Sequence, residues 1–290
     1  MNSFLARLFL FLTATTLLQP LAFAETSVWK VQKDEATVYV GGTIHVLRPS
    51  DYPLPVEFEH AFQTSQIITF ETDIRQMNSP KLAHKMLMRL SYSDERTIKS
   101  EVSPETYALL SKYATASGIS LNFMRKAKPG MLMSALMLAE LRKIGVSQQG
   151  IDLFFLNRTE KEGKLADFLE TPEEQIEFLA DMGVGNEEAF YQNMLRDFKN
   201  TQKLFATMIK HWRTGNSEDL DLAVNQVMKA QSPKIFQSIL VDRNNNWLPV
   251  IENYFETSEI EFVLVGAAHL IGEEGLIYQL KQKGYQVSKL

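Results

Sequence analysis

The sequence predicts an α/β fold in which a central, mixed and partly parallel sheet is built from the N- and C-terminal segments. A large helical region lies between these segments. At 38–45 an apolar run leads into the pattern Gly-x-x-His, and the same arrangement returns at 262–269, more than two hundred residues later. Each copy is followed by a helical pattern and another short apolar run, and strand-helix-strand units of this kind imply parallel neighbours.

The two ends of the chain supply the predicted strands. The first strands alternate apolar and polar side chains around Asp34 and Glu35, which is typical of a hairpin. The predicted elements at the N-terminal end are strands at 27–33 and 36–41, a proline-rich loop at 47–55, a helix at 56–65 and a strand at 66–70. Those at the C-terminal end are a strand at 261–265, a turn at 272–275, a helix at 276–283 and a strand at 285–290.

The middle of the chain, about 79–256, has mainly helical periodicity. Ser103-Pro104-Glu105 and Thr171-Pro172-Glu173 have the capping residue, proline and acid that begin helices. One short strand is plausible around 164–170, and the middle could be either an insertion or a lobe of the fold. The predicted helices are 81–90, 104–117, 121–126, 131–144, 172–182, 187–213, 217–229, 233–240 and 248–256, the last preceded by a polar run at 242–247.

Residues 1–24 have the pattern of a signal peptide. One basic residue, Arg7, precedes the apolar stretch 8–18, and Ala-Phe-Ala at 22–24 fits a cleavage site. The alternative is an uncleaved membrane anchor, although the stretch is short for a span and is interrupted at 19–20. We therefore expect an exported protein, periplasmic or secreted, with no membrane span after cleavage and a single domain over 25–290.

Composition excludes several kinds of chemistry. The 290 residues are 45% hydrophobic and contain no cysteine, so disulfides, thiolate nucleophiles and cysteine-ligated metals are excluded. The net charge is −5, and no basic stretch interleaved with aromatic residues occurs, so we do not expect a nucleic-acid partner. The oligomeric state is left open by the sequence.

Two histidines and a carboxylate follow strands of the predicted sheet. His45 and His269 come just past strand ends, where open α/β sheets bind their ligands, and Glu71 ends the strand between them. Gly42 and Gly266, which begin the two patterns, allow the backbone to turn sharply or approach a ligand closely. We expect these groups to converge, although a strand-end histidine can also be purely structural.

This trio is compatible with two kinds of chemistry. Two imidazoles and a carboxylate can hold a divalent metal and leave positions for water, whose pKa the metal would lower. The same trio without metal could perform general acid/base hydrolysis. Asp73 lies near Glu71 in the sequence and could replace it as the functional carboxylate.

Other polar residues have a functional and a structural interpretation. Glu170 could be a second strand-end carboxylate or part of a helix cap, and Asp152 could equally cap a helix. Arg243 could bind a carboxylate or an oxyanion, or form a structural salt bridge. Arg48 could point into the cleft or lie on the surface. Structural roles are favoured for the remaining histidines, which are His60, His84 and His211.

Methionines recur on two predicted helices, at 86 and 88 and at 131, 133 and 137. They could line an adaptable groove for an apolar peptide. Packing in the core is the favoured interpretation.

The ordered set of motifs resembles the TraB/PrgY/GumN family, which includes the Tiki metalloproteases. The bacterial, signal-peptide-bearing GumN-like subgroup is the most similar, and the resemblance covers nearly the whole mature chain. The motifs are Gly42-Thr43-Ile44-His45, Glu71, Gly150-Ile151-Asp152, Leu169-Glu170-Thr171 with Gln175, Trp212 with Gly215, Arg243-Asn244 and Gly266 through Gly272.

The resemblance implies an α/β fold similar to erythromycin esterases and the haem-binding ChaN proteins. For Tiki relatives it implies a divalent-metal-dependent peptidase, with manganese, cobalt or zinc bound at His45, Glu71 and His269. Erythromycin esterases use similarly placed residues without a metal, so the resemblance implies hydrolysis of a peptide or small-molecule substrate more strongly than proteolysis. The alternative class is a protein that binds haem, metal or a small ligand without turnover.

Overall fold

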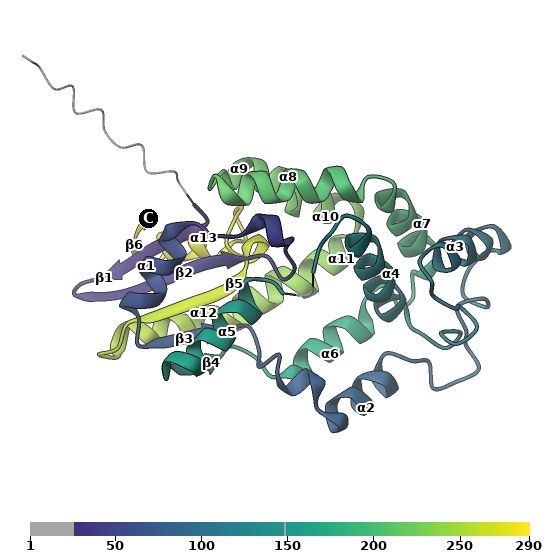
Figure 1. The fold of residues 1–290 in the computed structure, drawn as a ribbon, viewed down its shortest axis with the longest axis horizontal. Helices are drawn as coiled ribbons and strands as arrows, with labels where there is room; N and C mark the ends of the chain where they lie inside the picture. Colours follow the sequence, from purple (N-terminus) through teal and green to yellow (C-terminus); the bar gives the residue numbers. More distant parts are fainter. Residues whose placement is uncertain (1–25, 148) are drawn as a thin grey trace, which may run out of the picture.

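The computed structural model describes residues 26–147 and 149–290 (Figure 1). The predicted signal peptide at 1–24 lies outside the described residues. A sheet with its covering helices forms one part of the molecule, and a group of helices extends from it to form the other part (Figure 1). This agrees with the predicted α/β class and its large helical region.

The sheet has six strands in the order β4-β3-β5-β2-β1-β6. Strands β4, β3, β5 and β2 run parallel, whereas β1 is antiparallel to both β2 and β6. The central strand β5 is buried along its whole length, as expected for a strand with parallel neighbours on both sides. The strands are β1 (Val28–Lys33), β2 (Ala36–Thr43), β3 (Ile67–Phe70), β4 (Leu165–Phe168), β5 (Glu261–Gly266) and β6 (Gln286–Lys289).

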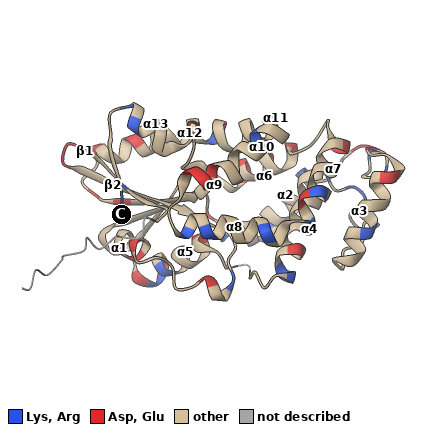
Figure 2. Ribbon diagram, turned by 90° about the horizontal axis from the view of Figure 1, so that it is seen from above, with Lys and Arg blue, Asp and Glu red and all other residues tan. Residues whose placement is uncertain are grey.

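Helices cover both faces of the sheet (Figures 1 and 2). On one face lie α1 (Val56–Thr64), α5 (Ile151–Glu162) and α8 (Thr201–Arg213), and on the other lie α12 (Asp242–Asn253) and α13 (Leu276–Gln282). The ring of Phe58 in α1 lies 6.2 Å from Phe155 in α5 and 6.3 Å from Phe262 in β5, between ring centroids. This aromatic cluster joins the helices to the sheet by burying a large apolar area.

The helical part has its own core. Its buried residues include Leu110, Leu132 and Tyr191, and they form a cluster separate from the core around the sheet. The helices of this part are α2 (Pro80–Arg89), α3 (Pro104–Ala116), α4 (Pro129–Lys143), α6 (Pro172–Asp181) and α7 (Glu187–Phe198). The chain returns to the sheet through α8, α9 (Ser217–Ala223), α10 (Asn225–Gln231), α11 (Pro233–Phe236) and the π turn η3 (Gln237–Val241). Short 3₁₀ turns lie at η1 (Pro49–Asp51), η2 (Gln76–Asn78), η4 (Tyr254–Glu256) and η5 (Ala267–His269).

Several predicted boundaries are wrong. The segment 121–126 forms turns instead of a helix, because its last two carbonyls accept hydrogen bonds from the backbone of Tyr92 and Ile98 in the loop between α2 and α3. The predicted helix 187–213 is interrupted at 199–200, and 217–229 is interrupted at Val224. The polar run 242–247 is helical from Asp242 onward, and α5 was not predicted as a helix.

The plausible strand at 164–170 belongs to the main sheet. As β4 it pairs with β3 from Ile67–Leu165 to Phe70–Phe168. One strand of the sheet therefore comes from the middle of the chain, and it brings the residues that follow it to the same edge as the other strand ends.

Candidate functional site

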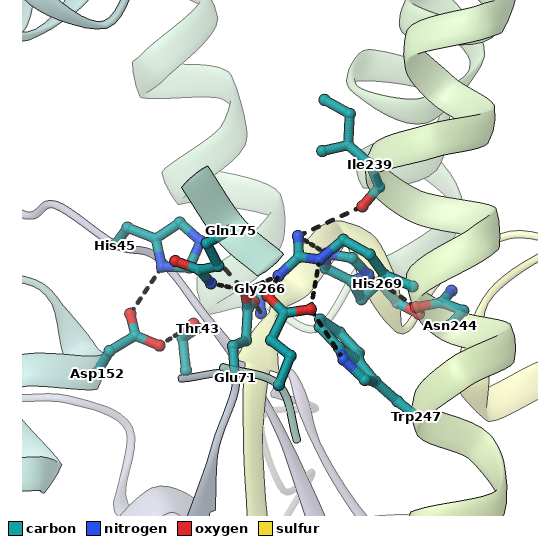
Figure 3. Close-up of polar contacts among 12 residues, drawn as sticks. Thr43, His45, Glu71, Asp152, Gln175, Ile239, Asn244, Trp247, Gly266 and His269 are labelled. Carbon is teal, nitrogen blue, oxygen red and sulfur yellow. Dashed lines mark hydrogen bonds and ion pairs between the residues drawn. The ribbon is translucent and has the colours of Figure 1, made fainter. Parts of the chain in front are cut away.

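The four parallel strands end at one edge of the sheet, where polar side chains gather (Figure 3). His45 follows β2, Glu71 follows β3, Glu170 follows β4 and His269 follows β5. Strand pairing aligns Thr43 with Gly266, so the loops that carry the two histidines leave the sheet side by side. The structure thus brings together the residues that the matched strand ends predict, at the edge where open α/β sheets bind ligands.

His45 is oriented by Asp152 at the start of α5. The Nδ1 atom of His45 lies 2.9 Å from Asp152 Oδ2, and the Thr43 hydroxyl donates to Asp152 Oδ1 over 2.8 Å. The imidazole is 62% exposed, and Asp152 contacts its Nδ1 atom and not its Nε2 atom. The nearby Asp152 carboxylate raises the pKa of His45 to about 9, so the ring is positively charged at neutral pH.

Gly150 allows α5 to begin directly against the His45 backbone. A Cβ atom at position 150 would lie 2.1 Å from the carbonyl carbon of His45, which no real side chain could tolerate. The Ile151 backbone N–H also donates to the Ile44 carbonyl over 3.1 Å. This close approach places Asp152 beside His45 instead of leaving it as a simple helix cap, and Asp152 makes no side-chain capping bond of α5 among the described contacts.

Glu71 is buried and accepts hydrogen bonds on both carboxylate oxygens. Its Oε1 atom accepts from the Gly266 backbone N–H over 2.7 Å. Its Oε2 atom accepts from Arg243 Nη2 over 2.5 Å and from Gln175 Nε2 over 3.4 Å. Burial works to raise the pKa of Glu71, but the charge of Arg243 and then that of His45 outweigh it and hold the pKa at about 2.

Arg243 joins two buried carboxylates. Its Nη2 and Nε atoms donate to Glu170 over 2.6 and 3.1 Å, and Nη2 also donates to Glu71. Its Nη1 atom lies 3.4 Å from the Ile239 carbonyl and 3.1 Å from His269 Nε2. Each guanidinium nitrogen therefore has a partner within the protein. Of the two predicted roles of Arg243, this arrangement fits a structural salt bridge better than a donor to an oxyanion.

Glu170 occupies the site, and the neighbouring residue caps the helix. The Thr171 side chain accepts from the Glu174 backbone N–H at the start of α6, while the Glu170 carboxylate turns toward Arg243 and Trp247. The indole N–H of Trp247 donates to Glu170 over 3.2 Å. Burial raises the pKa of Glu170 against the opposing effect of Arg243.

His269 is buried and held on both ring nitrogens. Its Nδ1 atom lies 2.7 Å from Asn244 Oδ1, and its Nε2 atom faces Arg243. Because arginine can only donate, Nε2 accepts and the proton of the neutral ring lies on Nδ1. Burial lowers the pKa of His269 to about 3, so the ring is uncharged at neutral pH. Its ring packs on Trp247 with 4.5 Å between centroids.

An open position lies between His45 and Glu71. His45 Nε2 and Glu71 Oε1 are 3.9 Å apart, which is too long for a direct hydrogen bond. A Cβ atom on Gly266 would lie 3.3 Å from Glu71 Oε1, 3.4 Å from His45 Nε2 and 3.5 Å from His269 Cδ2. The glycine thus leaves room where the three side chains meet, and His269 presents a carbon atom to that room.

The predicted metal trio does not fit a three-ligand ion as these side chains lie. Within residues 26–147 and 149–290, no group of three His, Cys, Asp or Glu side chains is placed to share a metal ion. His269 has both nitrogens engaged, one of them facing the cationic Arg243. The chemical roles of His45, Glu71 and His269 remain predictions.

The site opens into a cleft of about 340 Å³. His45, Glu71, Asp152 and Arg243 line it on the sheet side, and Met182 and Ile239 contribute from the helical part. A volume of this size lies within the usual range of ligand pockets, roughly 300–1,000 Å³.

The other candidates lie outside this group of contacts. Asp73 pairs with Arg75 over 2.8 Å, so Glu71 is the carboxylate at the site. Arg48 pairs with Asp51, and the Gly42 carbonyl accepts the indole N–H of Trp212 over 2.7 Å. His60 and His84 are exposed and His211 is half-buried, and none of them lines the cleft.

Trp247 is a part of the site that sequence analysis did not identify. Thr43, Asn244 and Gln175 occur in the recognised motifs, but no role was predicted for them. Asn244 directly follows Arg243, and this position next to a predicted site residue could have indicated that Asn244 also lies at the site. Trp247 lies one helical turn after Arg243, and this spacing could have placed both side chains on the same face of a helix.

Fold and site together define a class of α/β protein with a histidine–carboxylate site at the ends of its parallel strands. The chain belongs to the TraB/PrgY/gumN family, whose model matches residues 27–289. It is 25% identical to Metalloprotease TIKI1 of Xenopus tropicalis over an alignment that covers 90% of this chain and 60% of that relative. The chain thus spans about 60% of that relative's length. No solved structure matches the chain.

No helix in the described part of the chain is both long and apolar enough to span a membrane.

Proposed function

We propose that the protein is an exported hydrolase that cleaves an amide or ester bond of a peptide or small-molecule substrate. The observation that supports this most directly is the open position between His45 Nε2 and Glu71 Oε1, at the wall of the cleft. A charged imidazole and an ionised carboxylate face each other there, with pKa values of about 9 and about 2. Two titratable groups whose pKa values are pushed apart are suited to opposite acid and base roles.

In the proposed reaction, a water molecule lies between these two groups and attacks the carbonyl carbon of the substrate. Glu71 accepts the proton of the water as the new carbon–oxygen bond forms. His45 donates its proton to the leaving nitrogen or oxygen as the carbon–nitrogen or carbon–oxygen bond breaks. Because a carboxylate of low pKa is a weak base, the position of the water must contribute much of the acceleration.

Asp152 and Arg243 act as positioning residues in this proposal. Asp152 keeps His45 protonated and directs Nε2 toward the cleft, which the contact at Nδ1 supports. Arg243 holds the Glu71 carboxylate by its Oε2 atom and leaves Oε1 facing His45. His269 and Glu170 hold Arg243 in turn.

A metal-dependent peptidase is the second candidate, because Metalloprotease TIKI1 is a relative of this chain. Manganese, cobalt or zinc would be the expected ion, with His45 and Glu71 as available donors. His269 could join them only by exchanging its contact with Arg243 for the ion.

The test is hydrolysis of peptide and ester libraries by the purified protein, with and without added manganese, cobalt or zinc. Replacement of His45 or Glu71 by alanine should abolish cleavage, whereas His84→Ala, an exposed histidine on α2, should not. Absence of cleavage under every condition, together with tight haem or metal binding, would instead support a non-catalytic binding protein. Fractionation of cells that produce the full chain tests the proposed export.

A further inference from the structure

A second cavity, of about 460 Å³, lies beside the catalytic cleft. Its walls come from α4, α7, α8, α10 and η3, and most of the lining side chains are apolar. Six of the twelve methionines of the chain take part. Because methionine is flexible and polarizable, such a wall can adapt to apolar groups of different shape. The six are Met133, Met137, Met182, Met194, Met208 and Met228.

The cavity is a gap between the two hydrophobic cores of the molecule. Phe205 on its wall belongs to the core around the sheet, whereas Phe190 and Phe198 belong to the core of the helical part. Leu204 and Val227 on its wall are 47% and 43% exposed, so the space opens to the solvent. The sequence favoured core packing for the methionines, but Met133 and Met137 are only half-buried and line this space as well as packing on the second core.

The cavity adjoins the cleft that holds the proposed site of hydrolysis. Met182 and Ile239 line both this space and the catalytic cleft. The carbonyl of Ile239 also lies 3.4 Å from Arg243 Nη1, which holds the catalytic carboxylate. A substrate whose reacting bond lies at His45 and Glu71 can therefore extend into the cavity past these two apolar side chains.

Its size and its few polar groups indicate what would fill it. A cavity of about 150 Å³ holds one benzene molecule, so 460 Å³ provides room for two or three bulky side chains. Asn193, Thr201 and Gln231 on its wall offer donors and acceptors for a peptide backbone. Asp197 is also on the wall and would repel the carboxylate of a fatty acid, which favours a peptide over a free acyl chain.

We propose that this cavity binds two or three bulky apolar side chains of the peptide substrate on one side of the cleaved bond. This inference rests on the proposed hydrolase function and makes it more specific: the substrate is an apolar peptide segment. The cavity determines specificity, while the residues at the sheet edge carry out the reaction.

The experiment measures binding separately from cleavage. A fluorescein-labelled octapeptide with two leucines and a phenylalanine is titrated by fluorescence polarisation against the His45→Ala protein, in which cleavage is blocked. A matched octapeptide has serine at these three positions. Met137→Gln and Met208→Gln are each added to the His45→Ala background, and Met88→Gln serves as the control because that side chain is 60% exposed on α2, outside the cavity.

We expect the apolar octapeptide to bind at least tenfold more tightly than its serine counterpart, and each cavity variant to weaken that binding about tenfold. Met88→Gln should leave binding unchanged, and thermal unfolding of all variants identifies any that fold poorly. If the apolar octapeptide binds more tightly and only the cavity variants weaken this binding, but the wild-type protein hydrolyses no substrate, the result would contradict the proposed function and still support the cavity assignment. Equal binding of the two peptides, an equal effect of Met88→Gln, or complete competition by laurate would overturn the assignment.

Discussion

The Nδ1 atom of His45 lies 2.9 Å from the Oδ2 atom of Asp152, although 107 residues separate them in the sequence. The contact exists because α5 begins against the loop after β2, where Gly150 has no side chain to hold the two backbones apart. It leaves His45 charged and partly exposed at the mouth of the cleft, with Nε2 3.9 Å from Glu71 Oε1. The charge and orientation of the strand-end histidine therefore depend on a helix from the middle of the chain.

Asp152→Asn keeps the shape of this contact but removes the negative charge. The pKa of His45 should fall from about 9 toward its ordinary value near 6.5. If His45 is the proton donor, the rate of the wild-type protein stays high until the pH passes about 9, and that of the variant falls once the pH passes about 6.5. At pH 8 about 90% of His45 is then protonated in the wild-type protein but only about 3% in the variant, so we expect roughly a 30-fold loss of rate.

The pH dependence of kcat/KM checks this prediction. Asp181→Asn, at an exposed carboxylate on α6, is the matched control and should leave the profile unchanged. A wild-type rate that instead rises with pH as His45 loses its proton would reverse the assignment, making His45 the base.

Gly266→Ala should block the open position between His45 and Glu71. The new methyl carbon would lie 3.3 and 3.4 Å from the two reactive atoms, in the space we assign to the attacking water. The backbone of Gly266 has a φ of −50°, which alanine adopts without strain, so folding should be preserved. We expect the rate to fall at least about 10²-fold with little change in melting temperature. A fully active, folded variant would show that the reaction does not use this position.

Arg243→Met should destabilise the fold strongly. It leaves the carboxylates of Glu71 and Glu170 buried without their common cation, and breaking a buried pair in this way costs about 3–5 kcal/mol. Adding Glu71→Gln should recover part of this loss because one of the two uncompensated charges is then absent. Urea unfolding of the single and double variants measures both effects. Independent, additive changes would indicate that the two residues are not coupled.

Removal of divalent metal should leave the rate unchanged if the acid/base reaction is correct. His269, the third residue of the predicted metal trio, already has Asn244 and Arg243 on its two nitrogens. The measurement compares hydrolysis before and after dialysis against EDTA, with metal content determined in both samples. Loss of activity that manganese, cobalt or zinc restores would favour the metal-dependent candidate instead.

Strand ends made much of the site predictable. Parallel strands terminate at a common edge, so His45, Glu71 and His269 could be placed together from the apolar runs that precede them. Glu170 was recognisable because its surroundings repeat those of Glu71 after another short strand. The partners of these groups were harder to find, since the Asp152–His45 contact depends on how a helix docks and helical periodicity does not specify docking.

The errors in the helical part have a similar cause. Residues 121–126 have helical spacing, but the last two carbonyls of this segment accept hydrogen bonds from the loop between α2 and α3 instead. The asparagine-rich run at 242–247 has low helix propensity, yet it is helical because tertiary contacts outweigh propensity. Asn244 is buried there, and its side chain bonds to His269 and to the Glu274 carbonyl.

Glu261, far from the site along β5, should make stability decrease as the pH rises. The residue is fully buried, Oε1 accepts from Thr257 over 3.1 Å, and no described group bonds to Oε2. Burial raises its pKa from the ordinary value of 4.5 to about 7, so the folded protein holds this proton between those values while the unfolded chain releases it. By linkage, the free energy of unfolding should then fall by about 1–3 kcal/mol from pH 4.5 to pH 8 because of this group.

Glu261→Gln removes the titrating carboxyl group. The free energy of unfolding of this variant should therefore depend less on pH between 4.5 and 8, even if the substitution also changes stability at every pH. Glu35→Gln, at an exposed position between β1 and β2, is the control and should keep the wild-type slope. Urea unfolding at half-unit pH intervals provides the measurement. Parallel profiles for wild type and Glu261→Gln would mean that Glu261 is ionised in the folded protein at pH 5, with a solvent or protein partner for its second oxygen.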